Sequence, residues 1–166
     1  MSLVLSPQQK AQIEQEGVAA HPNECCGAIL GKDVSSGEGI RRIVHRLEKL
    51  TNSYAADEQY HRFSLNPREL MELDKRAGEE GLAVLGFYHS HPDHPARPSE
   101  TDRLHAWPYY SYVIVAIAKA ADVGGTPTPQ TPMPQALTSW QLDEGTEQFV
   151  AEEVIIESKP KELNHV

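Results

Sequence analysis

Two histidines, His89 and His91, stand two positions apart at the end of an apolar stretch, in the sequence His-Ser-His-Pro. Residues i and i+2 of a β-strand project from the same face, so this spacing predicts two imidazoles side by side. Asp102 follows further along and offers a carboxylate oxygen as a third metal ligand. Three such ligands leave one position of a tetrahedral zinc ion open, and a water in that position has a pKa of about 7. The residue types and their spacing therefore predict one catalytic zinc ion per chain and a hydrolysis reaction.

The segments around these residues indicate how the chain would hold them. Residues 83–89 are apolar, with β-branched and aromatic members, which is typical of a buried central strand. Three prolines between His91 and Ser99 stiffen the return of the chain. Ser99 then begins a predicted helix whose first turn contains Asp102. The end of a strand and the start of a helix would thus supply the ligands.

Hydrolysis at such a centre also needs a general base for the attacking water and a donor for the developing oxyanion. Glu24 is the candidate base, because it precedes the apolar stretch Cys25 to Gly31 and could reach across a sheet. Ser99 is the candidate donor. Each residue also has a plainer interpretation. Ser99 and Asp102 match a helix capping box, and an acidic residue before a strand is usually a solvated surface group.

Taken together, an upstream glutamate, His-Ser-His-Pro and a following Ser-x-x-Asp resemble the JAMM motif of the MPN-domain metallopeptidases. The resemblance implies that Glu24 is the general base and that Ser99 helps to stabilise the tetrahedral intermediate. It implies three zinc ligands, which are His89, His91 and Asp102. The similarity also covers Pro22 to Gly27, Phe63 to Pro67, Gly86 to Tyr88 and Pro108 to Ile117, so that it extends over nearly the whole chain.

The compact chain is most similar to the short prokaryotic branch of that family, whose members are associated with ubiquitin-fold sulfur-carrier proteins ending in Gly-Gly. The resemblance therefore implies a metallopeptidase or isopeptidase that cleaves an amide bond at such a tail, or in a similar peptide adduct. A non-catalytic MPN-type binding module is the alternative, although no metal ligand and no glutamate of the motif is missing. A zinc nucleobase deaminase would need His-x-Glu and Pro-Cys-x-x-Cys, neither of which occurs.

The wider pattern predicts a single α/β domain with a curved, mixed β-sheet flanked by helices, and the resemblance implies the related MPN, cytidine-deaminase-like fold. Helices are predicted from Ser6-Pro7 to Pro22 and from Asn66-Pro67 to Gly78. Strands are predicted at residues 25–31, 40–47, 83–89 and 112–118, followed by a C-terminal hairpin of residues 136–142 and 148–156. The proline-rich segment 126–134 is expected to be a mobile loop. The metallopeptidase domain would span residues 1–158, with a disordered tail at residues 159–166.

The length, charge and composition of the chain limit the classes of protein to which it can belong. A length of 166 residues suits one domain, and a formal net charge of -9 disfavours nucleic acid and anionic membranes as partners. The longest apolar run, Tyr109 to Ala118, is too short to span a membrane, and the first residues lack the features of a secretory signal, so a cytoplasmic location is expected. The adjacent Cys25 and Cys26 are expected to be reduced, with at least one of them packed in a strand. The sequence leaves open the oligomeric state and the roles of His94 and His105.

Overall fold

The structure is a computed structural model that describes residues 1–51, 67–119 and 131–158. Its elements are β1 (Ser2–Leu5), α1 (Pro7–Ala20), β2 (Cys26–Ser36), β3 (Gly39–Lys49), α2 (Pro67–Glu79), β4 (Ala83–Pro92), α3 (Glu100–His105), β5 (Ser111–Lys119), β6 (Pro132–Leu142) and β7 (Phe149–Ile156). The described strands form one closed sheet in the order β1-β3-β2-β4-β5-β6-β7. The sheet is mixed, since β1 runs parallel to β3 and β7, and β4 runs parallel to β5.

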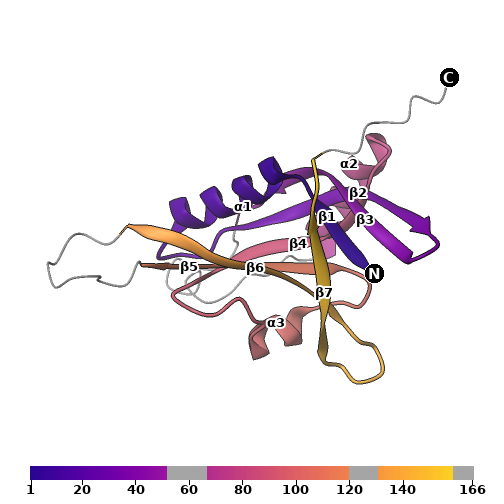
Figure 1. Cartoon of the computed structure of the whole chain (residues 1–166). Coiled ribbons are helices and arrows are strands. Elements are labelled where there is room, and N and C mark those ends of the chain that lie inside the picture. Colours follow the sequence, from indigo (N-terminus) through magenta and orange to yellow (C-terminus); the bar gives the residue numbers. More distant parts are fainter. Residues whose placement is uncertain (52–66, 120–130, 159–166) are drawn as a thin grey trace, which may run out of the picture.

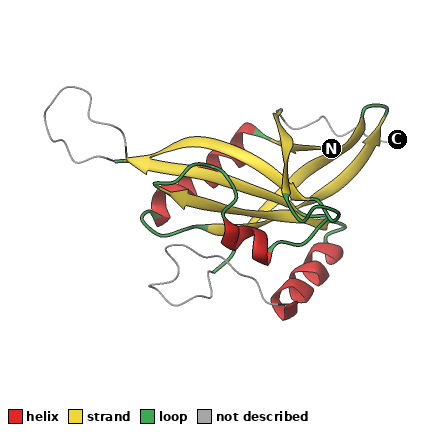
Figure 2. Cartoon of the chain, turned by 90° about the horizontal axis from the view of Figure 1, so that it is seen from below, coloured by secondary structure: helices red, strands yellow, loops and turns green. Residues whose placement is uncertain are grey.

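Helices lie on both sides of the sheet. Figure 1 shows α1 along one side and α3 on the opposite side, and Figure 2, seen from below, shows α3 in front of the strands. α1 buries Ile13 in the larger core cluster, whereas α2 buries Leu73 and Ala77 against Phe87 in a second cluster. The predicted fold class, a mixed sheet flanked by helices, is confirmed.

Most predicted elements are present, although their ends differ from the predicted ones. Ser6 caps α1 through a capping box, in which Gln9 N donates to Ser6 Oγ (3.1 Å) and Ser6 N donates to Gln9 Oε1 (2.8 Å). β2 and β3, which correspond to the strands predicted at residues 25–31 and 40–47, form a hairpin. β6 and β7 form the predicted C-terminal hairpin, and β4 and β5 lie side by side. The tail at residues 159–166 lies outside the described residues, so its disorder and the boundary at residue 158 stay predictions.

The structure departs from the predicted strands in two places: one strand was not predicted, and one begins inside a predicted loop. The sequence pattern does not reveal β1, because a run of four buried residues has no alternation to recognise. β1 pairs with β3 on one side and with β7 on the other, and it thereby closes a sheet predicted only to be curved. β6 begins at Pro132, inside the segment predicted to be a loop. Within the described part of β6, only Ser139 to Leu142 pair with β7, so the start of β6 is a sheet edge, where proline is tolerated.

An irregularity in β4 decides which of its side chains face which helix. The pairing of β2 with β4 shifts register between Ile29 and Leu30. Beyond this shift Tyr88 packs in the cluster of α1, while Phe87 packs in the cluster of α2. His89 and His91 follow Phe87 at intervals of two and share its face. Their ring centroids lie 4.9 Å apart, as the same-face prediction requires.

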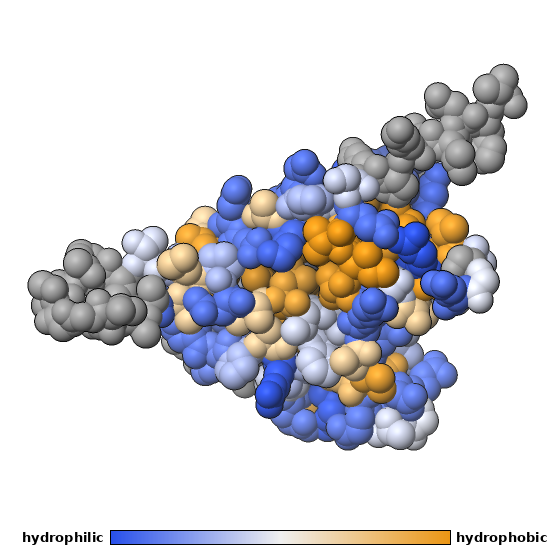
Figure 3. Space-filling model, in the orientation of Figure 1, coloured by the Kyte–Doolittle hydropathy of each residue, from blue (hydrophilic) through white to orange (hydrophobic). Residues whose placement is uncertain are grey.

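The surface mixes polar and apolar groups. Apolar surface gathers over β7 in Figure 3, where Val150 and Ile156 are 56% and 41% exposed. No helix within residues 1–51, 67–119 and 131–158 is long and apolar enough to cross a membrane.

Candidate functional site

β4 and α3 bring three potential metal ligands to one point. His89 Nε2 lies 3.1 Å from His91 Nε2, and each of these nitrogens lies 3.2 Å from one carboxylate oxygen of Asp102. The three ligand atoms all lie within 4.8 Å of one another. The side chains of His89, His91 and Asp102 are 4%, 8% and 16% exposed. The structure therefore brings together the three residues that the sequence predicts as ligands.

The donor set fits a zinc ion. Two nitrogens bound to a tetrahedral zinc at about 2.0–2.1 Å lie about 3.3 Å apart, close to the 3.1 Å between the two Nε2 atoms. Imidazole nitrogen and carboxylate oxygen are both common zinc ligands, and three protein ligands leave one position for water or substrate. The cluster can therefore hold a metal ion of the catalytic type.

The charges of the cluster favour the metal-binding form of Asp102. Burial opposes ionisation, but the positive charge of His89 and hydrogen bonds from His89, His91 and the Ser99 backbone hold the pKa of Asp102 well below its usual range. Burial acts to lower the pKa of His89, but the carboxylates of Asp102 and Glu24 together outweigh it, so that the pKa is raised. A metal ion would displace the proton of His89, because only neutral imidazole is a ligand.

Local hydrogen bonds fix the orientation of Asp102 and His91. Ser99 is the N-cap of α3: Asp102 N donates to Ser99 Oγ (3.0 Å), and Ser99 N donates to Asp102 Oδ2 (2.8 Å). The capping box expected for this pair is present, and it holds the same carboxylate that faces the histidines. His91 Nδ1 donates to the backbone carbonyl of Pro95 (2.9 Å), which leaves Nε2 to face the cluster. The sequence does not reveal this acceptor, because every residue has a backbone carbonyl.

Glu24 lies beside the cluster, on the wall of a cavity of about 320 Å³ that His91 and Ser99 also line. One of its carboxylate oxygens, Oε2, is inaccessible to solvent and has no hydrogen-bond partner among the described residues. Burial raises the pKa of Glu24 to about 7, although His89 and His91 act to lower it, and Asp102 adds to the rise. A carboxyl group with a pKa near neutrality can accept and return a proton at neutral pH.

Ser90 ties the segment that carries Glu24 to β4. Ser90 Oγ accepts a hydrogen bond from Cys25 N (2.8 Å), and Ser90 N donates to Cys25 O (3.1 Å). Ser90 is fully buried, and its side chain points away from the face of His89 and His91, as expected on a strand. The two bonds hold the neighbour of Glu24 against the strand between the two histidines. Ser90 is therefore more than a packed residue of the strand, because it positions the segment that carries Glu24.

We expect Ser90→Ala to lower the free energy of unfolding by about 1–3 kcal/mol, because it leaves the buried Cys25 N–H without its acceptor. Urea unfolding followed by circular dichroism measures this change. Ser158→Ala makes the same substitution at an exposed position and should change the stability by less than about 0.5 kcal/mol. Equal stabilities of the two variants would contradict the role given to this hydrogen bond.

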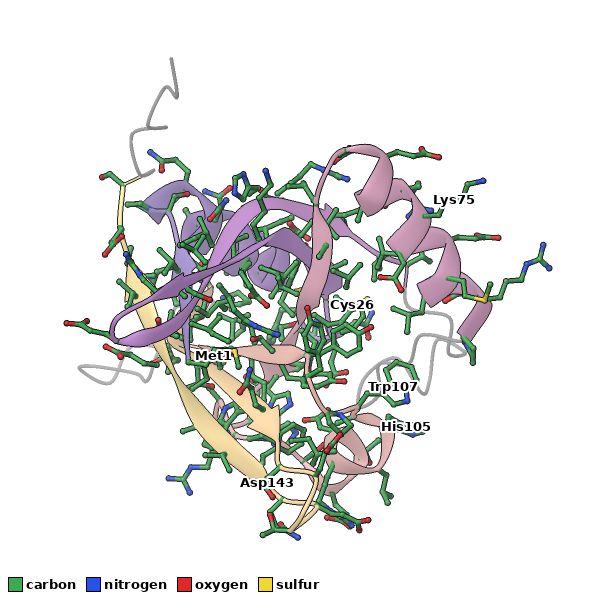
Figure 4. The ribbon with its side chains drawn as sticks, turned by 90° about the vertical axis from the view of Figure 1, so that its right-hand side faces the viewer. Met1, Cys26, Lys75, His105, Trp107 and Asp143 are labelled. Carbon is green, nitrogen blue, oxygen red and sulfur yellow. The ribbon has the colours of Figure 1, made fainter. Side chains whose placement is uncertain are left out.

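The side chains whose roles the sequence leaves open differ in their surroundings. Cys25 and Cys26 are buried, as expected for at least one of them, and burial raises their pKa values to about 11 and 12. Both are therefore thiols at neutral pH, which makes them poor nucleophiles and metal ligands. His94 lines the cavity of Glu24, whereas His105 is exposed at the end of α3, where Figure 4 shows it near Trp107.

The chain is similar to known proteins over most of its length. A family model described as prokaryotic homologs of the JAB domain matches residues 7–143. A protein of Haloferax volcanii named Desampylase is 34% identical over 102 residues, which span 60% of this chain and 68% of that relative. A Pyrococcus furiosus protein of the same name is 28% identical over 109 residues, which span 64% of this chain and 70% of that relative. The solution structure of a Desulfitobacterium hafniense protein matches with a TM-score of 0.70 and 29% identity, over 99% of each chain.

Proposed function

Because this chain belongs to the family of prokaryotic homologs of the JAB domain, we propose that it is a zinc-dependent isopeptidase. It hydrolyses the amide bond between the C-terminal tail of a ubiquitin-like protein and an amine. The observation that carries the proposal is the convergence of His89, His91 and Asp102 next to the cavity of Glu24.

Similarity to the proteins named Desampylase supports the substrate class, since that name indicates a hydrolase that releases a ubiquitin-like modifier. The substrate that we propose in more detail is the Gly-Gly tail of a ubiquitin-fold sulfur carrier, joined to an amino acid or a peptide. Glycines carry no side chains, so an extended Gly-Gly tail can enter a narrow cleft and be held there by backbone hydrogen bonds. The proposed place of action is the cytoplasm.

The residues of the site divide the reaction between them. His89, His91 and Asp102 hold the zinc ion, which when bound activates water and polarises the carbonyl of the scissile bond. Glu24 takes a proton from the attacking water and delivers it to the leaving amine. The Ser99 hydroxyl donates to the oxyanion, because its oxygen already accepts the Asp102 N–H and its own proton is available.

Metal analysis tests the centre itself. We expect about one zinc per chain in the wild-type protein, and loss of most of it in His89→Ala and in His91→Ala, because each removes one of three ligands. His105→Ala is the matched control, since this histidine is exposed at the far end of α3, and it should keep the full zinc content. All variants should stay folded by circular dichroism, because the core of a domain of this size does not depend on one ion. Full zinc content in both ligand variants would rule out the assignment.

Cleavage of a defined adduct tests the reaction. The substrate is a ubiquitin-fold carrier protein extended beyond its Gly-Gly end by a short peptide. Mass spectrometry should find a carrier that ends in Gly-Gly together with the free peptide, and a chelator should stop the reaction until zinc is restored. An intact substrate after incubation with the zinc-loaded protein would refute the activity and favour a binding module.

A further inference from the structure

We propose that Arg97 is a specificity-determining residue: it binds the α-carboxylate of the leaving residue and selects, among the adducts of the proposed function, those in which that carboxylate is free. This inference rests on the proposed function for the reaction itself. It adds the chemistry of the amine side of the scissile bond.

Arg97 has a fixed place at the site. It is exposed and lines the cavity together with Glu24 and Ser99. Its backbone N–H donates to Pro95 O (2.8 Å), the same carbonyl that accepts the hydrogen bond from His91 Nδ1 (2.9 Å). The carbonyl of Pro95 therefore fixes both the ring orientation of His91 and the backbone position of Arg97.

The residue before Arg97 anchors the loop to the sheet. Ala96 is buried against Ile114 and Ala116 of β5. Its carbonyl accepts a hydrogen bond from Thr138 Oγ1 of β6 (2.7 Å). The backbone at Arg97 is thus tied to two strands and to the ligand loop, which fixes the point beside the cavity from which its side chain extends.

The charge of Arg97 is not neutralised within the described part of the chain. Every other arginine described there has a carboxylate partner: Arg41 with Glu157, Arg42 with Asp33, Arg46 with Glu80, Arg68 with Glu72, Arg76 with Glu48 and Arg103 with Glu100. Arg97 forms no ion pair with any described residue, although the protein has 24 acidic residues and a net charge of -9. A guanidinium presents parallel N–H groups that match the two oxygens of a carboxylate, so a carboxylate of the substrate can form an ion pair with Arg97.

The proton path places this anion close to the scissile bond. Glu24 delivers its proton to the leaving amine, so the amine nitrogen lies in the cavity that Arg97 also lines. In an amino acid a single carbon separates that nitrogen from the carboxylate, whereas the ε-amine of a lysine in a protein has no carboxylate so near. The carboxylates of Glu24 and Asp102 would repel a substrate anion at this site, and the charge of Arg97 offsets that repulsion.

Two substrates that differ in one group test the inference. One is a ubiquitin-fold carrier that ends in Gly-Gly-Ala with a free carboxylate, and the other is the same chain with a C-terminal carboxamide. Calorimetry with chelator-treated, metal-free protein gives the two Kd values, and kinetics with the zinc-loaded enzyme gives kcat/KM. An exposed ion pair contributes a factor of up to about five, and a hydrogen bond to a charged group about ten to a hundred. Because a guanidinium–carboxylate contact combines the two, we expect the wild type to bind the acid about tenfold more tightly.

Three variants assign the preference to Arg97. In Arg97→Gln the acid and the amide should bind equally, through weaker binding of the acid, while binding of the amide stays nearly constant. Arg97→Lys should keep part of the preference, because lysine retains the charge and loses the paired donors. Arg41→Gln removes the same charge from a partly exposed position on β3, where Arg41 pairs with Glu157, and should keep the full preference.

Equal binding of the two substrates by the wild type, or an unchanged preference in Arg97→Gln, would overturn the inference. Failure of the proposed function looks different. In that case neither substrate is cleaved, while metal-free protein still binds the acid more tightly and Arg97→Gln does not. Cleavage of both substrates at equal rates, with equal Kd values, would instead keep the isopeptidase and remove Arg97 from substrate selection.

Discussion

Glu24→Gln is expected to lower turnover of a carrier–peptide adduct by a factor of about 10² to 10⁴ while leaving zinc bound, since general-base catalysis contributes about that much. The amide of glutamine has nearly the shape of the carboxylate, but it cannot take a proton from water. Glu24 lines the cavity of Ser99 and His91, and its buried Oε2 has no hydrogen-bond partner among the described residues. Steady-state kinetics and metal analysis of the same preparation measure both quantities.

Glu144→Gln is the control for this substitution, because Glu144 is exposed in the turn between β6 and β7. It should keep wild-type turnover and zinc content. Wild-type turnover in Glu24→Gln would remove Glu24 from the mechanism. Loss of zinc from Glu24→Gln would make the residue a ligand in place of a base.

The part of the site that the sequence predicts is the part built by local structure. His89 and His91 share a face because both lie in one strand, where the side-chain period is two. Ser99 and Asp102 are joined by a capping box within a single helical turn. Their types and spacing are therefore sufficient to place each pair without knowledge of the rest of the chain.

The part that depends on contacts between distant segments needs the structure. Glu24 reaches the cavity because β2 pairs with β4, with Cys26 opposite His89, and no periodicity in either strand specifies that partner or that register. For the same reason the Ser90–Cys25 bonds and the closure of the sheet by β1 are absent from the predictions. The family resemblance identified Glu24 as the general base, whereas the pairing of β2 with β4 explains why Glu24 lies beside the cavity.

Ser99→Ala is expected to lower turnover by a factor of about 10² to 10³ and to lower the free energy of unfolding by about 1 kcal/mol. Both effects come from the Ser99 hydroxyl. Its oxygen accepts the Asp102 N–H as the N-cap of α3, and Ser99 also lines the cavity of Glu24. If Ser99 only capped α3, stability would fall and turnover of the folded enzyme would not. Ser99→Thr keeps the hydroxyl and adds a methyl group, so it should cap well and retain part of the activity. Urea unfolding and steady-state kinetics separate the two effects.

Ser6 supplies the matched control, because it caps α1 with the same capping box and does not line this cavity. Ser6→Ala should cost about the same 1 kcal/mol and leave turnover unchanged. All variants need saturating zinc, since the backbone N–H and Oδ2 of Asp102 both belong to the cap of α3, and fraying of that cap would loosen a metal ligand. Unchanged turnover in Ser99→Ala at full zinc occupancy would return Ser99 to a structural role and leave the metal as the only oxyanion stabiliser among the groups named here.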